Sequence, residues 1–113
     1  MTSEEQARAI ALRLPEAVEQ DHHGRPSFRV RGKIFATLWD VDRLNVMLES
    51  DGILAAAAQR PGVCEPFWWG RRLGALQVDL ALADPELVDE LLSEAWSRRA
   101  PRRLVTRQPG EPD

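Results

Sequence analysis

The chain of 113 residues is long enough for one domain whose core needs no disulfide or metal to hold it together. Its 43 % hydrophobic and 29 % charged residues are typical of a globular protein and exclude a disordered one. A net charge of −3 argues against a protein that coats nucleic acid by bulk attraction, and the sequence has no apolar run long enough for a membrane span.

The N-terminal region predicts a helix followed by a short strand. Ser3 and Gln6 have the spacing of a capping box, so we expect a helix that begins here and ends near Leu14, ahead of a proline. Residues 16–20 fit a short edge strand, and the turn-forming residues of 21–26 indicate a loop.

Residues 27–39 predict a β-hairpin. Apolar and polar residues alternate along its first part, and the dipeptide at 31–32 ends in a glycine, which favours a tight turn. This turn gives one cross-strand pair on each face: Phe28 with Phe35, and Arg29 with Ile34. A second turn at 40–42 leads into a third strand at 44–48, which completes an antiparallel meander.

A middle helix is expected next, capped by Ser50 or Asp51 and stopped by the Arg-Pro-Gly sequence at 60–62. We expect its apolar stripe to consist of four residues: Ile53, Leu54, Ala57 and Ala58. The aromatic residues 67–69 are expected in a loop, and residues 73–82 in a late strand.

The last predicted helix is capped by Asp84 and has Pro85 in its first turn. We expect six residues on its buried side: Leu87, Val88, Leu91, Leu92, Ala95 and Trp96. A single domain is expected over residues 1–104, followed by a disordered tail at 105–113. Strands in sequence with segregated helices predict an α+β fold: an antiparallel sheet, made of a meander plus a late strand, with N-terminal, middle and C-terminal helices.

The cysteine content and the N-terminus indicate the compartment. Cys64 is the only cysteine, which fits a reducing environment, and the acidic N-terminus is unlike a signal peptide. Arginine supplies fourteen of the fifteen basic residues, which indicates a GC-rich bacterial genome. We therefore expect a soluble, cytoplasmic, bacterial protein.

Two stretches of the chain resemble the MmcQ/YjbR family of small bacterial proteins. The first consists of LPEAVE at residues 14–19 and PSFRVRGKIFA at residues 26–36. The second consists of VDLA at 78–81, EAW at 94–96 and the Ala-Pro pair at 100–101. The order of elements between them agrees, so the resemblance extends to about Leu104, and the Gly-Lys step of the hairpin is its most specific part.

The resemblance implies a fold like that of type III secretion chaperones and frataxin-like (CyaY-like) proteins, with protruding hairpins likened to a double-wing DNA-binding arrangement. It implies DNA binding, and one namesake in an antibiotic gene cluster points to protection of DNA or protection against a drug. The chain departs from the family in two places. Strand 44–48 lacks a lysine often found there, and the usual Gly-Trp pair before the late strand is replaced by Trp68-Trp69-Gly70.

Basic residues of the hairpin and of a later loop are the candidate nucleic-acid contacts, because they can reach phosphates. They are Arg25, Arg29, Arg31, Lys33, Arg71 and Arg72. The alternative is a solvated strand face that their methylenes cover. A further basic run, which either caps the last helix and then continues as a solvated tail or acts as an electrostatic arm, consists of Arg98, Arg99, Arg102, Arg103 and Arg107.

Trp68 and Trp69 are the candidate ligand-binding residues, because indoles can stack on bases or line a groove. The alternative is that they pack beneath the sheet, and we expect Trp39 and Trp96 in the core. An exposed pair would be informative, since a soluble monomer seldom displays two indoles side by side.

No catalytic or metal site is expected. His22 and His23 are adjacent, and no further histidine or cysteine cluster completes a coordination sphere. Cys64 has no histidine near it in the sequence, and neither a phosphate-binding glycine loop nor a serine elbow is present. We therefore expect neither an enzyme nor a cofactor.

Two functions follow from these residues. The first is weak DNA binding through the basic hairpin. The alternative is a module that binds a small molecule or a protein through a groove near Trp68 and Trp69, in a chaperone-like or a drug- or stress-protection role. In both cases we expect a monomer or weak homodimer that does not bind a membrane.

Overall fold

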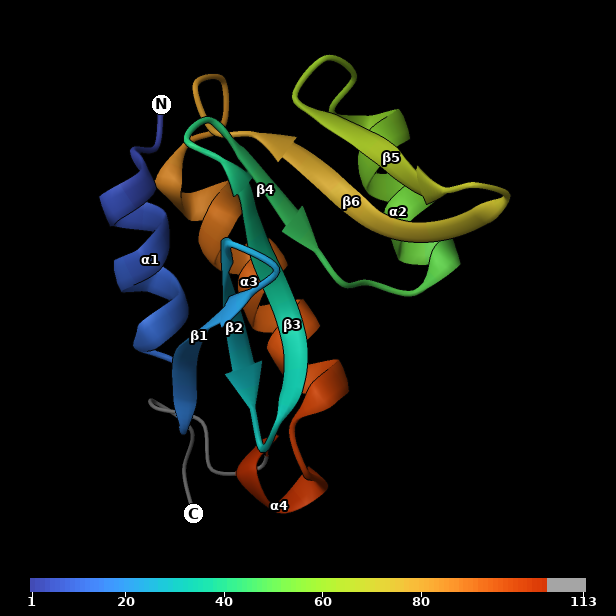
Figure 1. The fold of residues 1–113 in the computed structure, drawn as a ribbon. Helices are drawn as coiled ribbons and strands as arrows, with labels where there is room; N and C mark the ends of the chain where they lie inside the picture. Colours follow the sequence, from blue (N-terminus) through green and yellow to red (C-terminus); the bar gives the residue numbers. More distant parts are fainter. Residues whose placement is uncertain (106–113) are drawn as a thin grey trace.

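An antiparallel sheet of six strands carries its helices on one face (Figure 1). The structure is a computed structural model that describes residues 1–105. In chain order the elements are α1 (Glu4–Leu12), β1 (Ala17–His22), β2 (Arg25–Val30), β3 (Lys33–Asp40), β4 (Arg43–Val46), α2 (Ser50–Gln59), β5 (Cys64–Trp69), β6 (Arg72–Asp79), α3 (Pro85–Arg99) and α4 (Arg102–Val105). The strand order is β1-β2-β3-β4-β6-β5, so β1 to β4 form the predicted meander and the α+β fold is confirmed.

Helix α1 begins with the predicted capping box. The Ser3 hydroxyl accepts a hydrogen bond from the Gln6 N–H, and the Gln6 side chain accepts one from the Ser3 N–H. The helix ends at Leu12, two residues earlier than expected, because Leu14 precedes a proline and is disfavoured in the helical conformation. Its buried residues are Ala7, Ile10 and Ala11.

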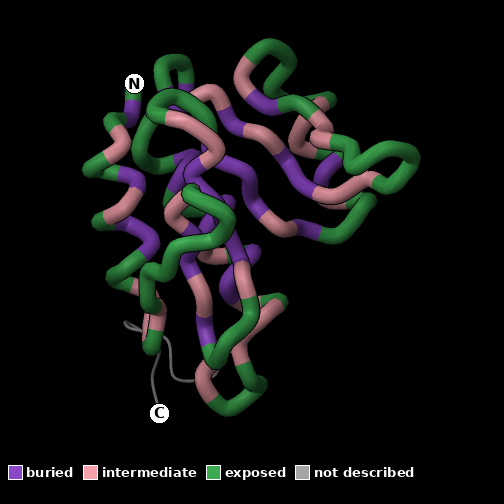
Figure 2. The backbone as a smooth tube through the Cα atoms, in the orientation of Figure 1, coloured by how far each residue is buried: buried purple, intermediate pink, exposed green. Residues whose placement is uncertain are grey.

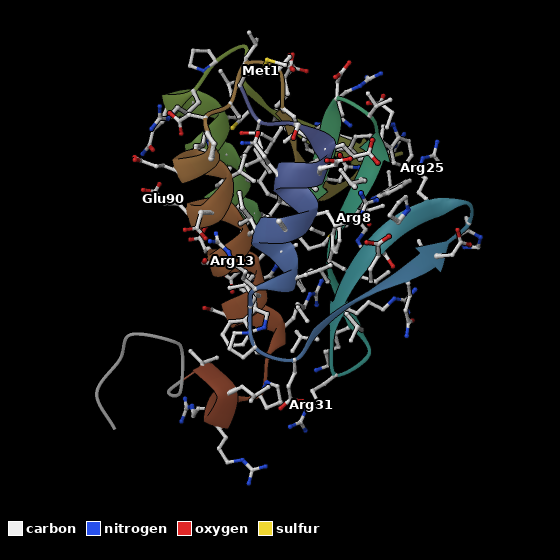
Figure 3. The ribbon with its side chains drawn as sticks, turned by 90° about the vertical axis from the view of Figure 1, so that its left-hand side faces the viewer. Met1, Arg8, Arg13, Arg25, Arg31 and Glu90 are labelled. Atoms are coloured by element: carbon white, nitrogen blue, oxygen red, sulfur yellow. The ribbon has the colours of Figure 1, made fainter. Side chains whose placement is uncertain are left out.

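The loop predicted at 21–26 is wrong, because β1 and β2 form a tight hairpin there. His23 and Gly24 both have positive φ, 54° and 84°, which lets a two-residue turn join paired strands. Pro26 is tolerated in β2 because the pairing with β3 begins only at Ser27. The hairpin bends away from the helices and lies on the side of the sheet that the helices do not cover (Figure 3).

The second hairpin, β2–β3, has the predicted turn, and its two turn residues have φ values of 51° and 81°. The pair of Arg29 with Ile34 is confirmed. The pair of Phe28 with Phe35 is wrong, because the register shifts there and Phe28 lies opposite Ala36. Both phenylalanines are nevertheless fully buried.

Helix α2 differs from the prediction in its cap and its buried side. Its N-cap is Glu49, which makes no side-chain capping bond, rather than Ser50 or Asp51. Only Ile53 of the predicted apolar stripe is fully buried. Two members of that stripe are exposed: Leu54 and Ala58.

The aromatic residues 67–69 lie in strand β5 rather than in a loop, and β5 pairs with β6 at one edge of the sheet. Aromatic residues are common in strands, and here tertiary pairing outweighs the adjacent glycine and arginines. Helix α3 agrees with the prediction, since Asp84 accepts from the Leu87 N–H at 2.8 Å. All six residues expected on its inner side are buried.

The core lies between the sheet and helices α1 and α3 (Figure 2). Trp96 is fully buried, as expected, and its indole N–H donates to the Pro15 carbonyl at 2.9 Å. Val105, expected in the tail, belongs to α4 and packs against the core with Leu104. The remaining residues of the expected tail, including Arg107, lie outside the described residues.

Candidate functional site

A pocket of about 580 Å³ lies on the face of the sheet opposite the helices. Its walls come from the β1–β2 hairpin, from β3 and β4, from the end of β5 and from the end of α3. Sites for small organic molecules commonly have volumes of about 300–1,000 Å³. We call it the open-face pocket.

Aromatic side chains form one wall of the open-face pocket. The rings of Trp39 and Trp69 meet edge to face with centroids 5.7 Å apart, and Phe67 contacts both rings at 5.0 and 4.8 Å. Trp39 was expected in the core. It lies on the open face because its neighbour Leu38 faces the helices and strand side chains alternate.

Trp69 lies directly on the backbone of Gly74. A Cβ atom at residue 74 would be 1.9 Å from Cδ1 of the indole. Gly74 is left unpaired at the irregularity in the β5–β6 ladder, where Phe67 pairs with Ala75 and Trp68 with Leu73. Because Gly74 has no side chain, the Trp69 ring can pack against the backbone there, and this sets the position of the aromatic wall.

The two candidate tryptophans are exposed, but they do not share a groove. Trp68 is 54 % exposed and Trp69 is 50 % exposed, so the alternative that they pack beneath the sheet is wrong. Alternation along β5 places them on opposite sides of the strand. Trp69 lines the open-face pocket and Trp68 does not.

Two pocket arginines are held by contacts with uncharged groups, which do not neutralise the guanidinium charge. Arg25 donates from Nε to the Trp39 carbonyl at 2.9 Å, and its guanidinium carbon lies 3.9 Å from the Trp39 ring centroid. This stacking is a cation–π interaction. Arg29 donates from Nε to the Ser27 hydroxyl at 3.1 Å, and that hydroxyl donates to the Gln20 carbonyl.

Positive charge in the pocket is not neutralised by neighbouring acids. Four cationic side chains line it: Arg25, Arg29, Lys33 and Arg99. No aspartate or glutamate does so among the residues that the structure describes. The arginines with ion-pair partners lie elsewhere: Arg8 with Glu4 and Glu19, Arg31 with Glu16, Arg43 with Asp40, and Arg98 with Glu49. The pocket therefore favours an anion.

The predicted nucleic-acid contacts are separated by the fold. Three of them line the open-face pocket: Arg25, Arg29 and Lys33. Arg31 instead makes a bidentate ion pair with Glu16, and the hydrogen bonds from its guanidinium lower the pKa of the Glu16 carboxyl. Arg71 and Arg72 lie at the β5–β6 turn and do not line the pocket.

Sequence reasoning missed two residues that matter for the site. Asn45 is 1 % exposed and lines the pocket. One signal in the sequence pointed to it: a polar residue between the buried Leu44 and Val46 must lie on the opposite face of the strand, which is the open face. Arg99, treated as part of a basic run, reaches the pocket from the end of α3. Only the spatial position of α3 reveals this.

The remaining candidates are two histidines and a cysteine. His22 and His23 lie at the β1–β2 tip with ring centroids 4.5 Å apart, and both line the open-face pocket. Cys64 is buried, and burial raises the pKa of its thiol. Within residues 1–105, no group of three or more histidine, cysteine or carboxylate side chains is placed to hold a metal, and no helix is long and apolar enough to cross a membrane.

Comparison with known proteins identifies the family. The YjbR family model matches residues 12–98, whereas a search of the curated proteins finds no significant match. Among solved structures, Deinococcus radiodurans protein DR2400, whose domain is named DUF419, has a similar fold with a TM-score of 0.70. Its sequence is 19 % identical over 85 % of this chain and 77 % of that one. The chain belongs to the YjbR family.

Proposed function

We propose that the protein is a binding module, rather than an enzyme, and that its open-face pocket holds a small organic anion with a flat apolar part. One observation carries the proposal: an aromatic wall and four cations without acidic partners line the same pocket. A flat ring would pack against Trp69 and Ile34, and the anionic group would lie among the cations of the pocket, which include Arg29, Lys33 and Arg99.

The expected affinity is moderate. Ligands of this size gain about 0.3 kcal/mol per non-hydrogen atom, so a ligand of about 20 such atoms gains roughly 6 kcal/mol. That corresponds to a dissociation constant of about 40 μM. Because the cations lie at a partly open site, added salt should weaken the binding.

A pair of naphthalene dyes tests the proposal. 1-Anilinonaphthalene-8-sulfonate carries an anionic group on a flat apolar body, and N-phenyl-1-naphthylamine has the same body without the sulfonate. We expect the sulfonate to bind with a dissociation constant of tens of micromolar and the neutral amine at least several-fold more weakly, measured by dye fluorescence at low salt.

Two variants of equal charge locate the site. Arg29→Gln should weaken binding of the sulfonate several-fold. Arg13→Gln, at a residue outside the open-face pocket, should leave it unchanged. Equal affinity for the two dyes, or equal effects of the two variants, would refute the proposal.

Duplex DNA binding is a second candidate function. Its supporting observation is that two hairpin tips project from the sheet, one at Gly32 and Lys33 and one at Arg71 and Arg72 (Figure 1). All four residues are exposed. Arg31 contributes little to this surface, because Glu16 neutralises it.

Fluorescence anisotropy of a labelled duplex at several salt concentrations tests this second candidate. Replacing Lys33, Arg71 and Arg72 by alanine should abolish binding and flatten its dependence on salt, since each phosphate contact adds about 0.9 to the log–log slope. Arg31→Ala should have a smaller effect than Lys33→Ala. Binding that survives the triple replacement with the same salt slope would contradict this candidate.

A further inference from the structure

Two hydrogen-bond donors without partners lie beside the open-face pocket. Among the described residues, two buried side-chain nitrogen or oxygen atoms lack a hydrogen-bond partner: Nδ2 of Asn45 and Nε of Arg99. Both residues line the pocket. An unpaired buried donor destabilises a fold, so two at one pocket indicate groups that a ligand would satisfy.

Asn45 is fixed in orientation by its neighbour in the sheet. Its Oδ1 accepts a hydrogen bond of 2.9 Å from Nε2 of Gln77, which pairs with it across β4 and β6. The other half of the amide, the NH₂ group, is therefore left for the pocket. Gln77 does not line the pocket, so Asn45 alone presents this donor to it.

Arg99 supplies the second donor from another direction. It belongs to the last turn of α3, whereas Asn45 lies in the middle of the sheet. A guanidinium nitrogen without a partner binds best to an oxyanion, because charge strengthens the hydrogen bond. The two donors therefore suit different acceptors. The amide of Asn45 can donate to a neutral or a charged oxygen, whereas the guanidinium of Arg99 favours an anionic oxygen.

We propose that the natural ligand is an organic acid that carries a second oxygen acceptor, such as a ketone or ester carbonyl, on its flat apolar body. The acid group binds at Arg99, and the second oxygen accepts from Asn45. Asn45 is thus a specificity-determining residue of the pocket. This inference rests on the proposed function and adds to it the chemistry of the ligand.

Three naphthalene acids of related shape serve as probes: 2-naphthoate, 6-acetyl-2-naphthoate and 6-isopropenyl-2-naphthoate. The acetyl and isopropenyl compounds differ only in a C=O against a C=CH₂ group, so their comparison isolates the acceptor. Their affinities are measured by displacement of 1-anilinonaphthalene-8-sulfonate. We expect the acetyl compound to bind about tenfold more tightly than the isopropenyl compound, because the latter leaves the Asn45 donor unpaired.

Variants of Asn45 test whether this residue recognises the carbonyl of the ligand through a hydrogen bond. Asn45→Leu should bring the ratio of the two affinities close to one. In the ligand-free protein this variant loses both the unpaired donor and the hydrogen bond from Gln77, whose partly exposed amide can bind water instead. Its stability should therefore stay close to that of the wild type, whereas a purely structural role would make it clearly less stable. Asn45→Asp keeps the oxygen that accepts from Gln77 and removes the donor, so it should also lose the preference and serves if the leucine variant does not fold.

A matched pair tests the acid end. Arg99→Lys keeps the charge but removes Nε–H, and it should weaken 2-naphthoate several-fold. Arg102→Lys, on the exposed surface of α4, should not.

The outcomes separate this inference from the function on which it rests. If 1-anilinonaphthalene-8-sulfonate itself does not bind, the proposed function fails. If the dye binds but no naphthoate displaces it, the assignment of the acid group to Arg99 is overturned while the pocket remains a binding site. If the acetyl and isopropenyl compounds bind equally, or if the preference survives in both Asn45 variants, the carbonyl assignment is overturned while the pocket remains a binding site.

Discussion

Replacing Gly74 by alanine should move the aromatic wall of the open-face pocket. The new Cβ would lie 1.9 Å from Cδ1 and 2.2 Å from Nε1 of Trp69, where real Cβ contacts are not closer than about 3.0 Å. The indole must therefore move by roughly 1 Å or more. This displacement weakens its contacts with Trp39 and Phe67, each of which is worth about 0.5–1.5 kcal/mol.

The same replacement at Gly52 is the matched control. There a Cβ would meet only the Leu48 Cβ, at an ordinary 3.8 Å, and Gly52 lies in helix α2, where alanine is favoured by up to about 1 kcal/mol. Neither residue has the positive φ that would make alanine strained. The loss of unfolded-state freedom is common to both variants, so their difference in stability reports the clash at residue 74 together with the helix preference at residue 52.

Urea denaturation of the two variants measures the effect. We expect Gly74→Ala to lower the free energy of unfolding by about 1–2 kcal/mol, and Gly52→Ala to raise it by up to about 1 kcal/mol. Gly74→Ala should also weaken binding of 1-anilinonaphthalene-8-sulfonate several-fold. A Gly74→Ala protein that is as stable as Gly52→Ala, with unchanged dye affinity, would refute the packing described for Trp69.

Three further predictions concern the fold. Trp96→Phe should lower the free energy of unfolding by about 2–3 kcal/mol in urea, because it leaves the Pro15 carbonyl unpaired and a void in the core. Glu16→Gln should remove the contribution of the ion pair with Arg31 to the free energy of unfolding. The wild type has this contribution above the ordinary carboxyl pKa of 4.5 and loses it as pH falls through the lowered pKa of Glu16 in the folded state. The stabilities of wild type and variant should therefore converge in acid, and a difference in stability that stays constant with pH would contradict this. Burial raises the pKa of the Cys64 thiol, so the native protein should react with a disulfide reagent much more slowly than the urea-unfolded chain, and equal rates would show that the thiol is accessible.

Local signals in the sequence predicted those elements whose ends are set by neighbouring residues. The capping box at Ser3 and the cap at Asp84 are confirmed because a few adjacent hydrogen bonds decide them. The second hairpin has the predicted turn for the same reason. Its register was partly wrong, since the extra residue Phe35 is accommodated by packing against the core, which no local pattern encodes.

The first hairpin and strand β5 could not be predicted from local composition. His23 takes a positive φ that a non-glycine residue seldom adopts, so residues 21–26 had the composition of a loop. Strand β5 exists because β6 offers it a paired edge, on the side of β6 that faces away from the meander.

The candidate site was predicted only in part. Arg25, Arg29 and Lys33 were identified by their charge, and Trp69 by its size. The partners that turn them into a pocket, Asn45 and Arg99 among them, come from β4 and from the end of α3. Their convergence depends on tertiary structure rather than on spacing.

The four tryptophans provide the most direct test of the open-face pocket. Trp39 and Trp69 line it, Trp68 is exposed on the other side of β5, and Trp96 is buried in the core. In a ¹⁵N-labelled protein titrated with 1-anilinonaphthalene-8-sulfonate, the indole N–H signals of Trp39 and Trp69 should shift while those of Trp68 and Trp96 stay in place. Shifts confined to Trp68, or no shift at any of the four indoles, would contradict a ligand site on the open face.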